Sequence, residues 1–362
     1  MATTKEQEYF SRLVEQLQRM TQRPVKIMEV CGTHTMAIAA AGIRQILPPE
    51  VELVSGPGCP VCVTADMDID AFLDLATRED VTIATYGDML RVPGTEGSLA
   101  DIRAQGGRVQ VVYSATEALQ LARENPDREV VFLAVGFETT APATAHALTV
   151  AQAEKINNFS IFNLHKMVPP ALRALLADEE TAVDGFILPG HVSAIIGEEP
   201  YRFVAEEFGR PGVIAGFEPV EIMAALVQLV TLLNRREARI TNLYRHVVRP
   251  EGNRTALALL ERVFQPANAI WRGLGEIPDS GLKLREELFP YDAEVKFGVT
   301  RKPVAKRTAC RCGDVLKGLI KPPACPLFAR KCTPEQPQGP CMVSAEGTCA
   351  AYYHYHRRDS DG

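Results

Sequence analysis

Nine cysteines are the side chains of this sequence best suited to bind metals or exchange electrons, and they fall into two groups. Because thiolates bind soft metals and form disulfides, each group is a candidate site. The first group lies near the start of the chain, close to glycine and proline: Cys31, Cys59 and Cys62. The second group lies near the end: Cys310, Cys312, Cys325, Cys332, Cys341 and Cys349. The first group indicates a reactive site and the second a metal site.

Cys31 opens the segment Cys31-Gly32-Thr33-His34, which follows a short apolar run and precedes an alanine-rich helical stretch. A thiol at a helix N-terminus can have its pKa lowered from about 8.5 to between about 3.5 and 7.5. We therefore expect Cys31 to ionise easily, and His34 to bind a metal or orient a ligand. The alternative is a buried cysteine that packs as a small apolar residue beside a structural histidine. This segment alone favours neither interpretation.

Cys59 and Cys62 have Cys-x-x-Cys spacing, directly after Gly56-Pro57-Gly58. This spacing permits a short-loop disulfide or two ligands to one metal ion. Since the chain contains no second Cys-x-x-Cys, a paired zinc ribbon is disfavoured. The pattern favours a redox-active dithiol over half of a structural zinc site.

Two further polar segments each follow an apolar run. Glu138 and Thr139 follow residues 130–135, and His191 follows residues 186–188. They are candidate walls of the same ligand site. The alternatives are that the first segment only caps a helix, and that His191 only satisfies a buried polar contact.

The tail cysteines at 325, 332, 341 and 349 are separated by six, eight and seven residues. An iron–sulfur cluster takes four cysteine ligands, whereas zinc ligand pairs are usually two to four residues apart. We therefore predict a cluster held by Cys325, Cys332, Cys341 and Cys349, with zinc second and disulfides third. Cys310 and Cys312 remain as ancillary thiols, or one of them replaces a ligand.

Short runs rich in valine and isoleucine alternate with helical stretches, which predicts parallel sheets in an α/β fold. The chemistry-bearing segments follow predicted strands, and ligands bind at the carboxyl ends of parallel strands. We expect Rossmann-like α/β domains at residues 1–125 and 126–235, then an iron–sulfur domain at 236–362. The triplets Gly136-Phe137-Glu138 and Gly216-Phe217-Glu218 resemble each other, as two related halves would.

Composition excludes several classes of protein. The 362 residues are 46% hydrophobic and 23% charged, which is typical of a globular protein. A formal charge of −6 offers no basic field for nucleic acid. No run approaches a membrane span, and the N-terminal segment lacks the apolar core of a signal peptide. We expect a cytoplasmic protein, where reducing conditions disfavour structural disulfides.

Taken together, the motifs resemble the HypD family of [NiFe]-hydrogenase maturation factors, in order and over nearly the whole chain. The tail departs from the family pattern only at Ala329-Arg330, where Gly-Lys is common, and at Ala345, where serine is common; neither change removes a thiol. The resemblance rests on residues 31–35, 56–62, 136–140 and 189–193, and on the tail from Cys325-Pro326-Leu327-Phe328 to Cys349-Ala350-Ala351-Tyr352-Tyr353.

The resemblance implies two α/β domains, a [4Fe–4S] domain and a role in building the Fe(CN)₂CO group. It implies that a HypC-like chaperone shares the iron, that a HypE-like protein donates cyanide, and that the hydrogenase large subunit is served indirectly. Cys31 is implied as the iron ligand and Cys59 with Cys62 as the redox pair, while the four tail cysteines predicted above are implied as cluster ligands.

We hypothesise that electrons pass from the cluster through the dithiol to iron at Cys31, because adding or reducing carbon ligands at iron requires electrons. The main alternative is a free-standing thiol–disulfide reductase powered by the cluster, and a further alternative is a zinc-stabilised binding module. The sequence is compatible both with an enzyme and with an assembly platform.

Overall fold

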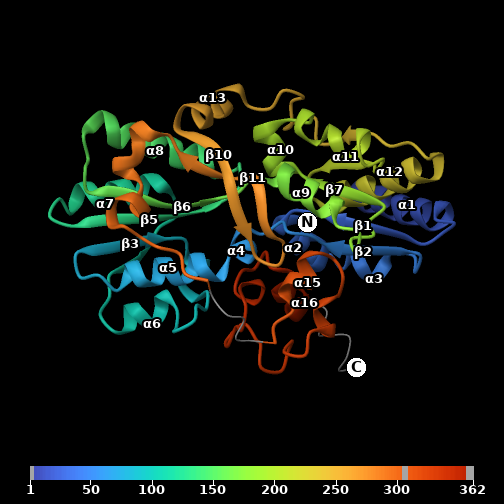
Figure 1. Cartoon of the computed structure of the whole chain (residues 1–362). Coiled ribbons are helices and arrows are strands. Elements are labelled where there is room, and N and C mark those ends of the chain that lie inside the picture. Colours follow the sequence, from blue (N-terminus) through green and yellow to red (C-terminus); the bar gives the residue numbers. More distant parts are fainter. Residues whose placement is uncertain (1–3, 304–308, 356–362) are drawn as a thin grey trace.

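Two parallel β-sheets form the body of the protein, as the computed structural model shows for residues 4–303 and 309–355 (Figure 1). The five-stranded sheet has the order β2-β1-β7-β8-β9 and the four-stranded sheet the order β4-β3-β5-β6. Every pairing within them is parallel, as predicted. The strands are β1 (Val25–Glu29), β2 (Val51–Ser55), β3 (Val81–Thr85), β4 (Val109–Val111), β5 (Glu129–Gly136), β6 (Phe159–His165), β7 (Gly185–Pro189), β8 (Gly212–Ala215) and β9 (Ile240–Asn242).

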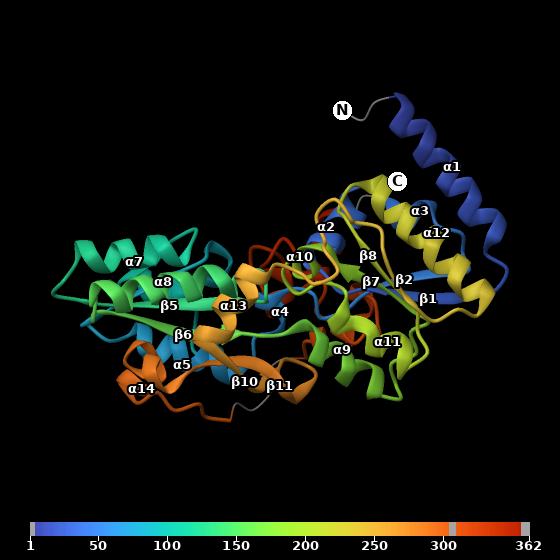
Figure 2. The ribbon, with the colours of Figure 1, turned by 90° about the horizontal axis from the view of Figure 1, so that it is seen from above.

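The central strands are continuous apolar runs because helices cover both faces of a parallel sheet. All of β7 and nearly all of β5 are buried. Near the five-stranded sheet, α1 packs on α12, as Figure 2 shows at one end of the molecule. The helices that accompany this sheet are α1 (Thr4–Met20), α2 (Gly32–Ala40), α3 (Ile43–Ile46), α10 (Gly190–Ile196), η2 (Glu199–Tyr201), α11 (Arg202–Glu206) and α12 (Pro219–Arg235).

The helices between residues 60 and 177 surround the four-stranded sheet or connect it to the other one. Ser98 and Ser114 cap two of them by accepting backbone N–H groups of the first turn. These helices are α4 (Pro60–Val63), α5 (Asp66–Ala76), η1 (Gly87–Arg91), α6 (Leu99–Ala104), α7 (Ala115–Glu124), α8 (Ala141–Glu154) and α9 (Val168–Ala177).

An antiparallel hairpin crosses the junction of the two sheets (Figure 1). It consists of β10 (Phe264–Trp271) and β11 (Gly275–Leu284), between α13 (Arg254–Val263) and the pair η3 (Glu286–Tyr291) and α14 (Ala293–Phe297). Its tip reaches α4, because Thr64 pairs with Trp271 and the Arg272 N–H donates to the Val63 carbonyl at 2.9 Å.

The cysteine-rich segment lies below the junction in Figure 1, against both sheets. It contains α15 (Cys312–Leu316), η4 (Pro322–Ala324), η5 (Pro340–Met342) and α16 (Thr348–Tyr355). One buried apolar cluster includes Val54 and Val131, one from each sheet, Trp271 of the hairpin and Cys341 of this segment. The segment therefore shares a core with the rest of the molecule.

The predicted α/β fold is confirmed, but the strands of the two sheets are not separated at the expected boundary between residues 125 and 126. That boundary falls between α7 and β5, within the four-stranded sheet, because β3 pairs with both β4 and β5. The chain leaves the five-stranded sheet after β2 and returns to it at β7. β9 also belongs to this sheet, although it follows the boundary expected at 235. Local patterns locate strands, but they do not say which strands pair.

Residues 304–308 and 356–362 of the predicted third domain lie outside the described residues. Across the described ranges, no helix combines the length and apolar character that crossing a bilayer requires.

The approach of the hairpin tip to α15 requires a glycine. Gly273 has φ +79°, and a Cβ there would lie 2.3 Å from Gly313 Cα. Gly275 also has φ +79°, but nothing lies within 4 Å of the equivalent Cβ position. We predict that Gly275→Ala lowers the free energy of unfolding by about 1–2 kcal/mol through backbone strain. Gly273→Ala should cost about 1–3 kcal/mol more, because the added methyl overpacks the contact.

Urea unfolding followed by fluorescence of Trp271, the single tryptophan, measures both variants. Equal losses for the two alanines would contradict close packing of the hairpin on the cysteine-rich segment.

Candidate functional site

A cavity of about 620 Å³ lies where the carboxyl ends of strands from both sheets meet the cysteine-rich segment. Residues after β1, β3, β5 and β7 line it, as expected for a ligand site of parallel sheets. The polar side chains in its wall include Cys31, Thr33, Thr139, His191 and Glu346. The structure thus brings together three residues predicted separately from the sequence: Cys31, Thr139 and His191.

Cys31 occupies the N-cap position of α2, with extended backbone (φ −148°, ψ 124°). Its N–H donates to Glu29 Oε2 at 3.1 Å, and the Gly32 N–H donates to the Gly58 carbonyl at 2.8 Å. A Cβ at Gly58 would lie 2.2 Å from the Cys31 nitrogen. Only glycine therefore lets the turn before Cys59 pack against the turn that carries Cys31.

The expectation that Cys31 ionises easily is wrong. Burial raises the pKa of its thiol to about 12, and the nearby Glu346 and Glu29 carboxyls act in the same direction. The backbone N–H groups of His34 and Thr33 lower the pKa, but by less than burial raises it. A metal that binds here must therefore displace a proton from the thiol.

His34 does not line the cavity. It is fully buried, and its Nε2 donates to the Gly216 carbonyl at 2.8 Å. Burial lowers the pKa of its imidazole to about 4, so the ring is neutral at pH 7. The contacts of His34 are therefore those of a structural histidine, which was the alternative considered for this residue.

Glu138 also lies outside the cavity wall, whereas its neighbour Thr139 is in it. Glu138 Oε1 accepts the Val168 N–H at 2.9 Å, and Oε2 is buried with no hydrogen-bond partner among the residues that the structure describes. Burial raises the pKa of this carboxyl to about 7.

The sequence did not reveal Glu346 as a wall residue. Its Oε1 accepts the Thr33 hydroxyl at 2.7 Å, and a Cβ at Gly32 would lie 2.6 Å from Glu346 Cβ. This contact joins the cysteine-rich segment to the Cys31 turn across more than 300 residues. A lone acidic residue between cysteines carries no periodic signal, so only the tertiary structure identifies it.

Glu29 and Arg44 were missed as well. Glu29 ends β1, where its buried Oε1 accepts the Thr35 hydroxyl at 2.6 Å and lies 3.9 Å from Arg44. The Arg44 guanidinium lies 5.2 Å from the centre of the Tyr352 ring. The signal in the sequence was that Glu29 is an acidic residue at the end of an apolar run. In the structure this residue supports the turn that carries Cys31.

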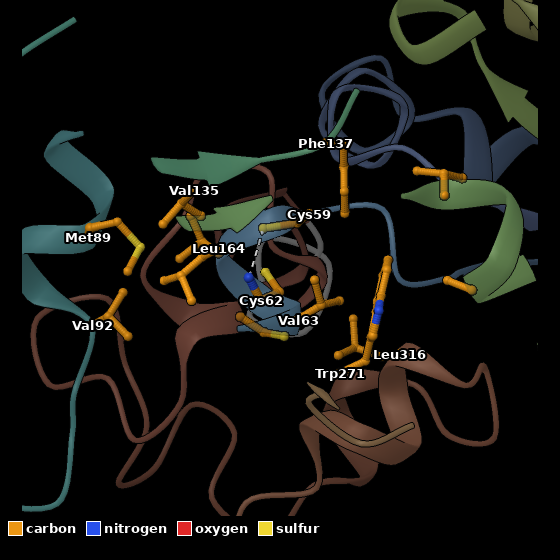
Figure 3. Close-up of a cluster of buried hydrophobic side chains, with 14 of the residues drawn as sticks. Cys59, Cys62, Val63, Met89, Val92, Val135, Phe137, Leu164, Trp271 and Leu316 are labelled. Atoms are coloured by element: carbon orange, nitrogen blue, oxygen red, sulfur yellow. Dashed lines mark hydrogen bonds between the residues drawn. The ribbon is translucent and has the colours of Figure 1, made fainter. Parts of the chain in front are cut away.

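Cys59 and Cys62 are buried beside the cavity, and Pro60 and Val61 between them line it. Cys59 Sγ accepts the Cys62 N–H at 3.3 Å, as the dashed line in Figure 3 shows. Figure 3 also places both cysteines in the apolar cluster that contains Phe137 and Trp271. Because α4 packs on η5, Cys62 also lies beside Cys341, and burial followed by the interaction with this thiol raises the pKa of Cys62.

Further thiols of the cysteine-rich segment follow Cys62 in a chain of neighbours. Hydrogen bonds from the Cys312 and Cys62 thiols lower the pKa of Cys341, and Cys312 in turn hydrogen bonds with Cys310. All nine cysteines are thiols in this structure.

Electrostatic interactions link the other tail thiols too, and one of them joins Cys349 to Cys341. After burial, the thiols of Cys310 and Cys325 help to raise the pKa of Cys332, and those of Cys312, Cys310, Cys332 and Cys325 help to raise the pKa of Cys349. A Cβ at Gly339 would lie 2.9 Å from Cys310 Sγ, so the glycine leaves room beside this sulfur. Thiolate sulfurs are the donors that an iron–sulfur cluster takes. Within residues 4–303 and 309–355, no three His, Cys, Asp or Glu side chains are grouped so as to hold one metal ion.

Comparison with known proteins shows the family of this chain. Residues 8–356 match the HypD family model, described as "Hydrogenase formation hypA family". The chain belongs to the HypD family. It is 45% identical over 350 residues to hydrogenase maturation factor HypD of Rhodobacter capsulatus, covering 95% of this chain and 93% of that protein.

Two other relatives show that the HypD match extends over nearly the full length. Hydrogenase maturation factor HypD of Escherichia coli K12 is 43% identical over 355 residues, which cover 98% of this chain and 95% of that one. Hydrogenase expression/formation protein HupD of Azotobacter chroococcum is 46% identical over 343 residues, which cover 93% and 90%.

The buried carboxyl of Glu138 predicts a pH dependence of stability. Its pKa is about 7 in the folded protein and 4.5 when exposed, so the folded state retains a proton that the unfolded state loses. Stability should therefore fall as the pH rises from 4.5 to 7, by about 3 kcal/mol from this group. Glu138→Gln removes that contribution, so the variant gains stability relative to the parent across this interval.

Urea unfolding at several pH values measures the difference between parent and variant, in which other titrating groups cancel. Glu218→Gln, at the exposed equivalent position of the other sheet, controls for loss of a carboxyl group. A difference that stays constant between pH 4.5 and 7 would contradict the raised pKa.

Proposed function

We propose that this chain is a scaffold on which the Fe(CN)₂CO group of [NiFe]-hydrogenase is assembled, with iron as its cargo bound by the Cys31 thiolate. A HypC-like chaperone supplies a second ligand through the cavity opening, a HypE-like protein donates cyanide, and the hydrogenase large subunit receives the product. The observation that supports this role is the convergence of Cys31, Thr33, His191 and Glu346 on one cavity at the carboxyl ends of both sheets.

The site has the chemistry that such cargo requires. Iron that carries cyanide and carbon monoxide is electron-rich, and thiolate is a suitable soft ligand. The cavity volume of about 620 Å³ accommodates an iron with diatomic ligands, and apolar residues such as Val30, Val61 and Val192 contribute to its wall. The Thr33 hydroxyl and the His191 ring are polar groups in the wall of the same cavity as this thiol.

The thiols beyond Cys31 form a route for electron pairs. Starting from a Cys59–Cys62 disulfide, the Cys341 thiolate attacks Cys62 Sγ and releases the Cys59 thiolate. Cys312 then attacks Cys341 Sγ, releases the Cys62 thiolate and leaves a Cys312–Cys341 disulfide. Two electrons have moved from the Cys312 and Cys341 thiols to the Cys59–Cys62 disulfide, which becomes a dithiol. The released thiolates of Cys59 and Cys62 take up the two protons that the attacking thiols lost.

The resident cofactor in this proposal is a [4Fe–4S] cluster, which when bound supplies single electrons. The contacts favour Cys310, Cys325, Cys332 and Cys349 as its ligands, with Cys310 in place of Cys341. The reason is that Cys341 interacts first with Cys312 and Cys62 and only then with Cys349, whereas Cys332 and Cys349 both interact with Cys310 and Cys325.

A free-standing thiol–disulfide reductase is the second candidate, and the interaction between the thiols of Cys62 and Cys341 favours it equally. A reductase needs no iron beyond the cluster, so it should contain about four irons per chain. A scaffold should contain additional iron that depends on Cys31.

We predict that Cys31→Ser abolishes hydrogenase maturation in cells, because the serine hydroxyl is a poor ligand for soft iron. Protein purified anaerobically should lose only the additional iron and keep the brown colour of the cluster, which shows that the variant folds. Full hydrogenase activity in the Cys31→Ser strain would overturn the scaffold function.

A pair of matched substitutions tests the ligand assignment. We expect Cys310→Ser to lose the visible absorbance and most of the iron, because a cluster ligand is removed. Cys341→Ser should retain the cluster but reduce maturation at least tenfold, because the thiol route is interrupted. Loss of the cluster in Cys341→Ser with retention in Cys310→Ser would instead support the set predicted from sequence spacing.

A further inference from the structure

The two Gly-Phe-Glu triplets place one phenylalanine ring at the end of a strand in each sheet. Phe137 follows β5 and stacks on Trp271, with ring centres 5.8 Å apart and planes inclined by 15°. Phe217 follows β8 and stacks on His191, with ring centres 4.0 Å apart and planes inclined by 27°. The equivalent positions thus have different ring partners, and the partner of Phe217 is a polar side chain of the cavity wall.

The pairing of Phe217 with His191 follows from strand register. β7 and β8 are adjacent and parallel, with Pro189 opposite Ala215. Two residues further along each chain, His191 and Phe217 are neighbours. A Cβ at Gly190 would lie 2.5 Å from the Ala215 carbonyl oxygen, so glycine is needed for the two turns to approach.

Phe217 is itself held by two other rings. The Tyr244 ring meets it edge-on, with centres 6.0 Å apart and planes at 85°. The His34 ring lies 4.7 Å from it, and the Nε2 of His34 donates to the carbonyl of Gly216, the preceding residue. His34, which does not reach the cavity, therefore fixes the backbone and one side of Phe217.

We propose that Phe217 is a positioning residue that holds the imidazole of His191 toward iron bound at Cys31. This inference rests on the proposed scaffold function. His191 is exposed to the cavity, where an unsupported ring would sample several rotamers. Stacking on Phe217 fixes the plane of the imidazole and leaves its nitrogen atoms at the ring edge, free to meet a ligand.

The alternative is that Phe217 only fills space between α2 and α10. A leucine retains most of that volume but has no π-face, whereas a tyrosine retains the face. Phe217→Leu and Phe217→Tyr therefore separate stacking from filling. Phe137→Leu is the matched control, because it makes the same change at the equivalent position without touching a histidine.

The first measurement is NMR of the full chain with ¹³C-labelled histidine rings, the His191 signals being assigned with His191→Gln. We expect the His191 ring protons to lose the ring-current shift of Phe217 in Phe217→Leu and to keep one in Phe217→Tyr and Phe137→Leu. His191 signals that are unchanged in Phe217→Leu would overturn the inference.

The second measurement is the Cys31-dependent iron retained after anaerobic purification. We expect retention to be roughly two- to tenfold weaker in Phe217→Leu and restored in Phe217→Tyr, in line with the strength of aromatic pairs. A lost ring-current shift with unchanged iron retention overturns the positioning role but leaves the scaffold intact. Absence of Cys31-dependent iron in the unmutated protein overturns the scaffold, and this inference with it.

Discussion

The hydrogen bond from the Gly32 N–H to the Gly58 carbonyl, 2.8 Å long, joins the two turns on which the site depends. One turn carries Cys31 and the other leads into Cys59 and Cys62. The hairpin tip contacts the residues after the second turn through Thr64 and Trp271, and Glu346 contacts the first turn through Thr33. Two sheets, the hairpin and the cysteine-rich segment therefore meet at one pair of glycine-dependent turns.

This convergence explains why Cys31 is buried and protonated without metal. The backbone N–H groups at the helix N-terminus lower the pKa of the thiol, but burial away from water raises it by more. A protonated thiol is a poor nucleophile and resists oxidation. The carboxyls of Glu29 and Glu346, which hold the two sides of the turn, disfavour the free thiolate further. A bound cation would reverse that contribution.

The sequence predicted the parts of the structure that depend on local patterns. Strands such as β5 and β7, the turn positions of Cys31 and His191, and the spacing of Cys59 and Cys62 were all readable from short segments. Strand order was not, because the chain crosses between sheets after β2 and returns at β7. Glu346 was missed for the same reason, since its importance comes from contact with Thr33 across the fold. The position of Cys341 beside Cys62 likewise depends on packing of α4 against η5, which no spacing rule contains.

The central claim is that one buried thiol at the meeting point of two sheets holds an iron atom while diatomic ligands are added. It is tested most directly by anaerobic co-purification with the HypC-like chaperone, followed by infrared spectroscopy of metal-bound cyanide and carbon monoxide. The account predicts both sets of stretching bands in the complex and neither set when Cys31 is replaced by serine. Bands of unchanged position and intensity in the serine variant would contradict it.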